Sequence, residues 1–251
     1  MKKIFIVIFF YSFSLVAQEN NVWLFQMHEM EVSGNVNEFV KDQKEFYKKL
    51  ASHGVKKGEW AGWSCFRSIT SPNKFIFIHH FNSVKQRVNP QIWTQSNVDE
   101  LGLKWPENTN YTTKTTKPIY IYQAINSVQE QDEPSKFWRL NYHKFQNLQN
   151  YIKLQNSWGD MVVKKSQKNI KAMNWGFGIV RSNEDGDIYN GISFDGYESL
   201  DQMLESQLYK PNQEGDPNVA KWWNKIQKED FAGSIKDGKR ELFRVVAETF
   251  N

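Results

Sequence analysis

The sequence predicts an α+β protein made of two similar halves, each with the order strand, helix, strand, strand, helix, strand. The segment from Trp23 to His28 returns 115 positions later as the segment from Trp138 to His143. Trp60 returns at the same offset as Trp175. Because similarity at a fixed offset is the signature of a repeated unit, we expect a duplicated module.

The first half opens with a strand over 22–29, where aromatic and aliphatic residues nearly alternate. Asn35 and Glu38 then have the spacing of an amide N-cap followed by a carboxylate, which predicts the start of a helix. Apolar residues recur at helical spacing after it, and His53-Gly54 predicts its end. The remaining predicted elements of this half are strands over 59–67, 74–81 and 117–125 and a helix from Ser83.

The second half repeats this order after a polar segment over 127–135, which we predict to be a linker between modules at 18–126 and 136–251. The predicted helices carry apolar residues at helical spacing over 148–162 and 200–208. The predicted strands cover 137–144, 174–181, 187–194 and 240–250.

The first seventeen residues have the pattern of a secretory signal peptide. Lys2 and Lys3 precede an apolar stretch from Ile4 to Val16, and Ala17 stands where the chain turns polar. The apolar stretch falls short of the ~20 residues that span a bilayer. We therefore expect a periplasmic or secreted protein that begins near Gln18 and is not inserted in the membrane.

Composition narrows the possible partners and the sources of stability. Removing Lys2 and Lys3 with the leader lowers the formal net charge from +4 to +2, which argues against nucleic acid as a partner. Cys65 is the single cysteine, so no intramolecular disulfide can form. The core must then come from apolar packing, for which ten Trp, ten Tyr and eighteen Phe are available.

The element order of each half is that of ferredoxin-like domains, in which helices cover one face of a four-stranded antiparallel sheet. With the repeated Trp and His positions, the chain resembles the dimeric alpha-beta barrel superfamily in its tandem form. The resemblance implies two sheets packed face to face as a barrel, with a cavity between them. That superfamily includes cofactor-independent monooxygenases, haem-degrading enzymes and isomerases, so the resemblance leaves the activity and any cofactor open.

Strand alternation predicts which side chains face that cavity. Trp23, Phe25 and Met27 share one face of the first strand, which we expect the helices to cover. The opposite face then carries polar side chains into the barrel: Gln26 and His28 in the first half, and Arg139, Asn141 and His143 in the second. Buried polar groups need partners, water or a ligand.

These polar side chains are the candidate site. His28 and His143 are candidate acids or bases, with Asn141 and Arg139 as further catalytic candidates, because imidazole titrates near neutrality. The alternative is a satisfied internal network that only joins the halves. We predict no metal site, because no carboxylate or thiol stands at ligand spacing and His79 and His80 point to opposite faces. Further candidates for substrate binding are Gln26, Tyr120, Tyr122 and Arg244.

Two classes of function remain open from the sequence. The first is binding or conversion of a small molecule in a cavity between the sheets. The second is a non-enzymatic interaction or glycan-binding module that uses exposed Trp and Tyr side chains. The chain has no glycine-rich phosphate loop, no Gly-x-Ser-x-Gly elbow and no His-Glu-x-x-His motif. Either a monomer or a homodimer is compatible with a duplicated chain.

Overall fold

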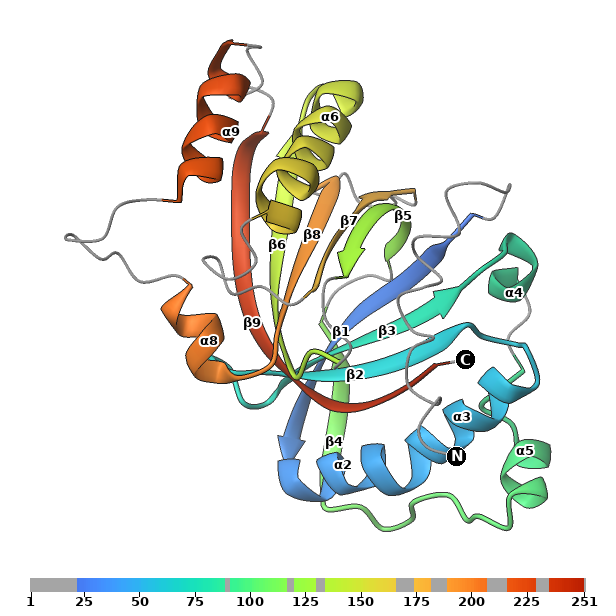
Figure 1. Cartoon of the computed structure of the whole chain (residues 1–251). Helices are drawn as coiled ribbons and strands as arrows, with labels where there is room; N and C mark the ends of the chain where they lie inside the picture. The colour runs from blue at the N-terminus through green and yellow to red at the C-terminus, as the bar shows by residue number, and fades with distance from the viewer. Residues whose placement is uncertain are drawn as a thin grey trace, which may run out of the picture. The chain divides into compact units, whose positions relative to one another are not determined.

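The computed structural model describes residues 22–88, 91–116, 120–129, 134–165, 174–181, 189–206, 216–228 and 235–250. The predicted signal peptide lies outside these residues. The chain is a mixed α+β protein with one large antiparallel sheet (Figure 1). Among the described residues, no helix combines the length and apolar character of a membrane-spanning segment.

The described residues fall into two compact units. The N-terminal unit comprises those within 22–123 together with 243–250, and the C-terminal unit comprises those within 124–242. Two long strands, β5 (Tyr120–Gln129) and β9 (Ile235–Phe250), contribute residues to both. Residues 127–129 of the predicted linker are therefore the end of β5. The predicted face-to-face packing of two sheets stays a prediction.

The N-terminal unit has the strand order β2-β3-β1-β5, which is the order expected for a ferredoxin-like sheet. β4 pairs with the end of β1, and the last residues of β9 pair with β2. Its elements, besides the first residues of β5 and the last of β9, are β1 (Leu24–Gly34), α2 (Val36–Asp42), η1 (Gln43–Tyr47), α3 (Lys48–Lys56), β2 (Gly62–Ser68), β3 (Lys74–Phe81), α4 (Val84–Val88), α5 (Gln95–Glu100) and β4 (Tyr111–Thr115).

The C-terminal unit has the matching order β7-β8-β6-β9, with β5 beside β7. Its helices α6 and α9 contact one another, as Figure 1 also shows. Its elements, besides its parts of β5 and β9, are β6 (Phe137–Phe145), α6 (Leu148–Trp158), η2 (Gly159–Val163), β7 (Asn174–Val180), β8 (Gly191–Tyr197), α8 (Leu200–Glu205) and α9 (Pro217–Lys228).

The first long helix begins as predicted and ends later than predicted. The Asn35 side chain accepts a hydrogen bond from the Glu38 backbone N–H at 3.2 Å, which caps α2. The predicted end at His53-Gly54 is wrong, because the helix continues to Lys56 and stops before Gly58, whose φ is +73°. Gly54 serves packing instead, since a Cβ there would lie 2.5 Å from Ile92 Cδ1.

Both long helices contain a π-helical turn, η1 in the N-terminal unit and η2 in the C-terminal unit. A π-helical turn inserts an extra residue and re-aims the side chains around it, and such turns occur often at functional sites. Gln43 of η1 is buried against the sheet, and η2 begins at Gly159 directly after Trp158.

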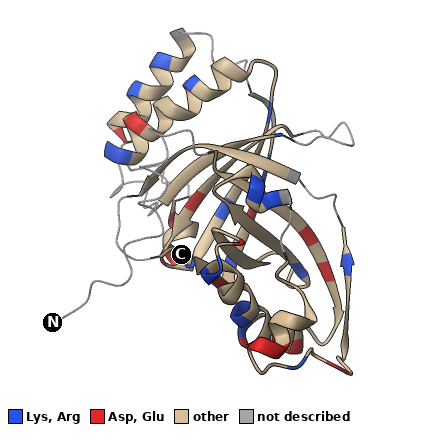
Figure 2. Ribbon diagram, turned by 90° about the vertical axis from the view of Figure 1, so that its right-hand side faces the viewer, with Lys and Arg blue, Asp and Glu red and all other residues tan. Residues whose placement is uncertain are grey.

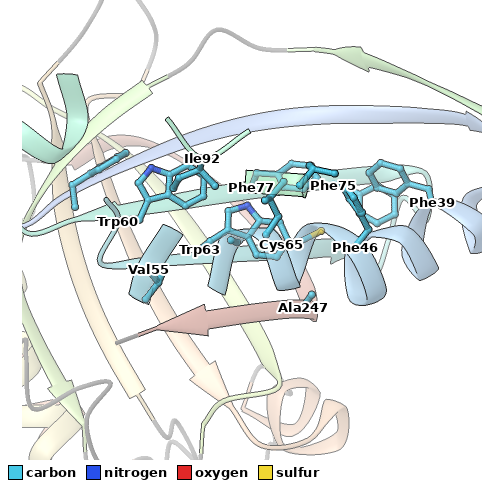
Figure 3. Packing of buried hydrophobic residues seen from close by; sticks show 14 of the residues in the cluster. Phe39, Phe46, Val55, Trp60, Trp63, Cys65, Phe75, Phe77, Ile92 and Ala247 are labelled. Atoms are coloured by element: carbon cyan, nitrogen blue, oxygen red, sulfur yellow. The ribbon is translucent and has the colours of Figure 1, made fainter. Parts of the chain in front are cut away.

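Helix and sheet of the N-terminal unit enclose an aromatic core (Figure 3). Phe39 and Phe46 come from the helix, and they pack toward Trp63, Phe75 and Phe77 on β2 and β3. Burying each large aromatic side chain stabilises the fold by roughly 1.5–3 kcal/mol. Cys65 is buried in this core, where desolvation raises the pKa of its thiol well above the usual value.

Charged side chains do not gather by sign on the described elements. Figure 2 shows Lys and Arg interspersed with Asp and Glu along helices and strands. Any charge selectivity of a site must therefore come from the side chains that line it.

Candidate functional site

The predicted site residues lie on the opposite sheet face from the one we predicted. His28 lines a cavity together with Phe39 and Tyr47 of the long helix, and Leu24 packs in the core beneath that helix. His143 and Asn141 likewise share a cavity with α6. The face assignment was wrong because it treated the most aromatic face as the helix-covered one, whereas both faces of β1 carry buried apolar residues.

A row of polar side chains crosses β6 and β8 in the C-terminal unit. The Arg139 Nε donates to Asp195 Oδ2 at 2.9 Å, and the Asn141 amide donates to the same oxygen at 2.7 Å. The Asn141 amide also lies 3.3 Å from Ser193 Oγ, and Ser193 Oγ lies 2.9 Å from His143 Nε2. We call these five residues the polar row. It is a continuous hydrogen-bonded chain from a cation to a neutral imidazole.

The strand register accounts for the polar row. Arg139 stands directly opposite Asp195, and Asn141 directly opposite Ser193, so each pair projects from the same sheet face at contact distance. His143 stands opposite Gly191. A Cβ at Gly191 would lie 2.7 Å from Tyr151 Cζ, so the glycine leaves the room that this ring of α6 occupies.

The polar row is one wall of a cavity of about 750 Å³ between the sheet and the helices of the C-terminal unit. Trp175 of β7, Trp158 of α6 and Trp222 of α9 provide aromatic walls. The Trp175 ring packs closely against Gly159, because a Cβ on residue 159 would lie only 2.7 Å from Trp175 Cζ3. Arg240 of β9 brings positive charge to the same cavity, whereas the Lys239 ammonium is paired with Glu241 at 2.8 Å and lies over the Tyr142 ring. Its volume lies within the range of small-molecule sites.

Trp222 is held in place by contacts with the neighbouring helix. Its indole Nε1 donates to Ser157 Oγ at 2.9 Å, and its ring packs edge-on against Trp158 with the ring centroids 4.8 Å apart. α9 therefore presents one ordered tryptophan to the cavity, while the adjacent Trp223 is 50% exposed.

Burial sets the charge states along the polar row. Desolvation lowers the pKa of His143 to about 4, with Asp195 opposing and Arg240 adding to this shift. The imidazole is therefore neutral at neutral pH. Burial would lower the pKa of Arg139, but the adjacent Asp195 and Tyr197 together outweigh this effect and raise that pKa above its usual value. The Tyr197 ring lies 5.7 Å from the Arg139 guanidinium, and desolvation raises the pKa of its hydroxyl.

The N-terminal unit holds a smaller cavity of about 250 Å³ around His28 and His79. It lies between β1, β3 and the long helix, and its lining includes Trp63, Phe77 and Trp93. His28 and His143, which stand at equivalent sequence positions, thus belong to two different cavities. Neither cavity is the predicted one between two sheets, since each is lined by residues of a single unit.

Those of the other predicted substrate-binding residues whose side chains the structure describes are not brought to either cavity. Gln26 shares a strand face with His28 but lines neither cavity. Tyr122 is buried on the opposite face, stacked on Phe25 at 4.9 Å. Arg244 is exposed, lies opposite Arg67 on β2 and lines neither cavity. The side chain of Tyr120 lies outside the described residues.

The sequence analysis did not identify the two residues of β8, Ser193 and Asp195, that hydrogen-bond to the predicted site residues of β6. Ser193 and Asp195 were expected at the end of a strand leading into a helix, whereas β8 runs from Gly191 to Tyr197. A signal was present in the sequence: Ser193, Asp195 and Tyr197 alternate with Ile192 and Phe194, so they share one face. That pattern could have matched them to Arg139 and Asn141.

Among the described residues, no three or more His, Cys, Asp and Glu side chains are grouped so that they could hold a metal ion. His79 and His80 do point to opposite faces, since His79 stacks on Trp60 and His80 lies near Phe250. The larger cavity offers hydrogen bonds and aromatic faces, the means by which proteins hold an organic ligand.

Three solved structures share the fold at low sequence identity. A "putative monooxygenase" from Fusobacterium nucleatum is 11% identical, with 93% of this chain and 96% of that chain covered and a TM-score of 0.52. One from Lactobacillus acidophilus is 9% identical, with 91% and 96% covered and a TM-score of 0.57. An "anthrone oxidase-like protein" is 8% identical, with 93% and 94% covered and a TM-score of 0.59.

Comparison with protein-family models finds no match, and comparison with curated protein sequences finds none either. At these identities the structural likeness shows the fold alone. This likeness and the strand orders of the two units confirm the predicted ferredoxin-like α+β class.

Proposed function

We propose that the protein binds a planar, hydroxylated aromatic molecule in the cavity of the C-terminal unit. The observation that carries this proposal is the polar row, which forms one wall of a cavity whose other walls hold three tryptophans. Such a combination of an apolar, aromatic enclosure with a few placed polar groups is typical of sites for organic molecules.

The walls specify the chemistry of the ligand. Trp158, Trp175 and Trp222 favour a flat ring system, because aromatic rings gain from stacked and edge-on contacts with one another. Ser193, Asn141 and the neutral His143 can donate to and accept from ligand hydroxyl groups. Arg240 favours a weakly acidic hydroxyl, whose anion it would stabilise.

Conversion of the ligand is a second candidate, favoured by the position of His143 on the cavity wall. In this step the ligand O–H bond breaks, the proton passes to the imidazole, and the electron pair stays on the ligand oxygen. Because burial lowers the pKa of His143 to about 4, the imidazole alone is a weak base. The transfer would need the resulting anion to be stabilised by Arg240. One structural neighbour is called an "anthrone oxidase-like protein", and an anthrone is a molecule of the proposed class.

The interaction-module alternative rests on exposed aromatic side chains. Trp223 is 50% exposed and Trp93 is 39% exposed, but Trp93 lines the cavity of the N-terminal unit and contacts Trp60. The described residues therefore offer Trp223 as a binding platform for a glycan, and the buried polar row has no role in that function.

Binding of emodin, a hydroxylated anthraquinone, tests the proposal. We expect emodin to quench tryptophan fluorescence with saturation, and we expect His143→Phe to weaken binding while keeping a ring at that position. Absence of saturable binding by a folded protein would contradict the proposal. Oxygen consumption with the anthrone dithranol then separates conversion from binding. Conversion would pass electrons from the deprotonated anthrone to O₂, so that the ring methylene becomes a carbonyl and one oxygen atom leaves as water. Uptake above the protein-free rate that is lost in His143→Phe supports conversion, and uptake no faster than the protein-free rate restricts the function to binding.

A further inference from the structure

The cavity of the C-terminal unit contains one positive charge that the residues around it do not neutralise. Four charged side chains line this cavity: Arg139, Asp195, Lys239 and Arg240. Arg139 pairs with Asp195 at 2.9 Å, and the Lys239 ammonium pairs with Glu241 at 2.8 Å. Arg240 makes no ion pair with another residue of the part of the chain that the structure describes. A negatively charged group on the ligand would therefore find an available partner.

Arg240 marks the opening of the cavity. It lines the cavity although it is exposed, whereas Asn141 and Asp195 of the polar row are buried. Desolvation is the main cause of the low pKa of His143, and the positive charge of Arg240 adds to that shift. Because the effect of a charge falls off with distance, the Arg240 guanidinium lies on the cavity side of β9, near His143.

The other polar groups that the cavity offers to a ligand are uncharged. Asn141, Ser193 and the neutral His143 belong to the polar row. Gln155 of α6 lines the cavity from the helix, is only 7% exposed, and makes no side-chain hydrogen bond with another described residue. An anionic group deep in the cavity would lose its hydration and lie near the Asp195 carboxylate, so its favourable place is the opening.

A carboxylate is the anionic group that fits Arg240 best. A guanidinium is always charged, and its planar fork of N–H donors matches the two oxygens of a carboxylate. Carboxyl groups have pKa values of ~4 and phenols of ~10, so a carboxylate is ionised at neutral pH without help from the protein. The single available positive charge also suits a carboxylate better than a phosphate monoester, which carries about −1.5 to −2.

From these observations we propose that the ligand of this cavity is an aromatic carboxylate. Arg240 binds the carboxylate at the opening, and the hydroxylated ring system lies inside, against the polar row and the tryptophans of the other walls. This inference rests on the function proposed above, because it narrows the class of ligand for the same cavity. In such a ligand the carboxylate takes the place of the weakly acidic hydroxyl beside Arg240.

Calorimetric titration of emodin and emodic acid at pH 6 tests this inference. Emodic acid has the rings and hydroxyl groups of emodin, with a carboxyl group in place of the methyl group. We expect emodic acid to bind about fivefold more tightly, a modest gain because Arg240 is exposed. Raising sodium chloride from about 0.05 M to about 0.5 M should reduce this preference, since salt screens exposed charges.

Arg240→Gln should remove the preference for emodic acid. Arg244→Gln is the matched control, because it makes the same substitution at another exposed position of β9 that lines neither cavity, and it should keep the preference. Circular dichroism verifies that both variants are folded. If one of them is not, the salt dependence of the preference in the unaltered chain still decides the question.

The outcomes distinguish this inference from the function on which it rests. Emodin binding without a preference for emodic acid overturns the inference and leaves the proposed function standing. A preference that Arg244→Gln removes as fully as Arg240→Gln, or that salt does not reduce, also overturns only the inference. If neither compound binds, the proposed function fails and the inference fails with it.

Discussion

Arg139 and Asp195 form a buried ion pair directly across β6 and β8, with Nε and Oδ2 2.9 Å apart and side chains only 15% and 7% exposed. The same carboxylate oxygen accepts from the Asn141 amide. The pair thus anchors the polar row at one end, and removing either partner leaves a charge without compensation in a poorly solvated place.

Asp195→Ala should therefore reduce the free energy of unfolding by ~3–5 kcal/mol, because it leaves the Arg139 guanidinium buried and unpaired. Asp195→Asn, which keeps the shape and one acceptor, should cost less. Urea denaturation followed by circular dichroism measures both. The double variant Arg139→Met with Asp195→Leu should recover most of the stability that Asp195→Ala loses. If the double variant were as unstable as Asp195→Ala, the unpaired charge of Arg139 would not be the cause of the loss.

Stability should fall as the pH drops from about 6.5 to about 4. Burial lowers the pKa values of His28 and His143 from 6.5 to about 4, so the unfolded chain takes up protons at a higher pH than the folded chain. The stabilisation is complete above pH 6.5, is lost through this window, and changes no further below it. Each pKa unit corresponds to ~1.4 kcal/mol, so one histidine contributes on the order of 3 kcal/mol at most.

Denaturant melts at several pH values between 7 and 4 measure this loss. The double variant His28→Phe with His143→Phe should show a shallower decline than the unaltered chain. An unchanged slope would mean that these two imidazoles are not the groups that take up the protons.

The fold class and the order of the strands and helices were largely accessible from the sequence, because alternation and helix caps are local signals. Asn35 with Glu38 gave the start of α2, and the predicted strand over 74–81 coincides with β3. The site was only partly accessible. Arg139, Asn141 and His143 were correctly placed on one strand face, but which face the helices cover depends on tertiary packing, since residues on both faces of β1 are buried.

There is also a physical reason why Ser193 and Asp195 were not predicted from the sequence. An aspartate such as Asp195 is uncommon in the interior of a strand, and its pairing with Arg139 and Asn141 of the neighbouring strand β6 makes its burial tolerable. A pairing of this kind depends on register between strands that lie about fifty residues apart, and the sequence does not state it. α5 and β4 were missed because they are short and lie in a region of irregular hydrophobic spacing.

Gly191→Ala should destabilise the C-terminal unit by ~1–3 kcal/mol through overpacking. The added Cβ would lie 2.7 Å from Tyr151 Cζ, and the Tyr151 ring is itself 5.7 Å from the His143 ring. Thermal melting gives the stability, and the imidazole resonances of His143 report the displaced ring. Gly238→Ala, where the nearest atom is Tyr142 O at 3.5 Å, should be close to neutral. Equal effects of the two substitutions would refute this packing argument.

Trp222 and Trp223 separate the cavity function from a surface function. Trp222→Ala should weaken emodin binding and lower the melting temperature, because the indole lines the cavity and donates to Ser157. Trp223→Ala should change neither by much, since that side chain is half exposed. If Trp223→Ala instead removed binding to a glycan array while emodin failed to bind at all, the interaction-module alternative would be favoured.

Calorimetric titration of emodin into the unaltered chain and Asn141→Leu tests the central claim most directly. Asn141 joins Asp195 to Ser193 in the middle of the polar row, and leucine has a similar size without the amide. We predict saturable binding at one site and a loss of affinity of about tenfold or more in Asn141→Leu, with His28→Phe binding emodin like the unaltered chain. Equal affinity of the unaltered chain and folded Asn141→Leu would contradict the claim that the polar row recognises the ligand.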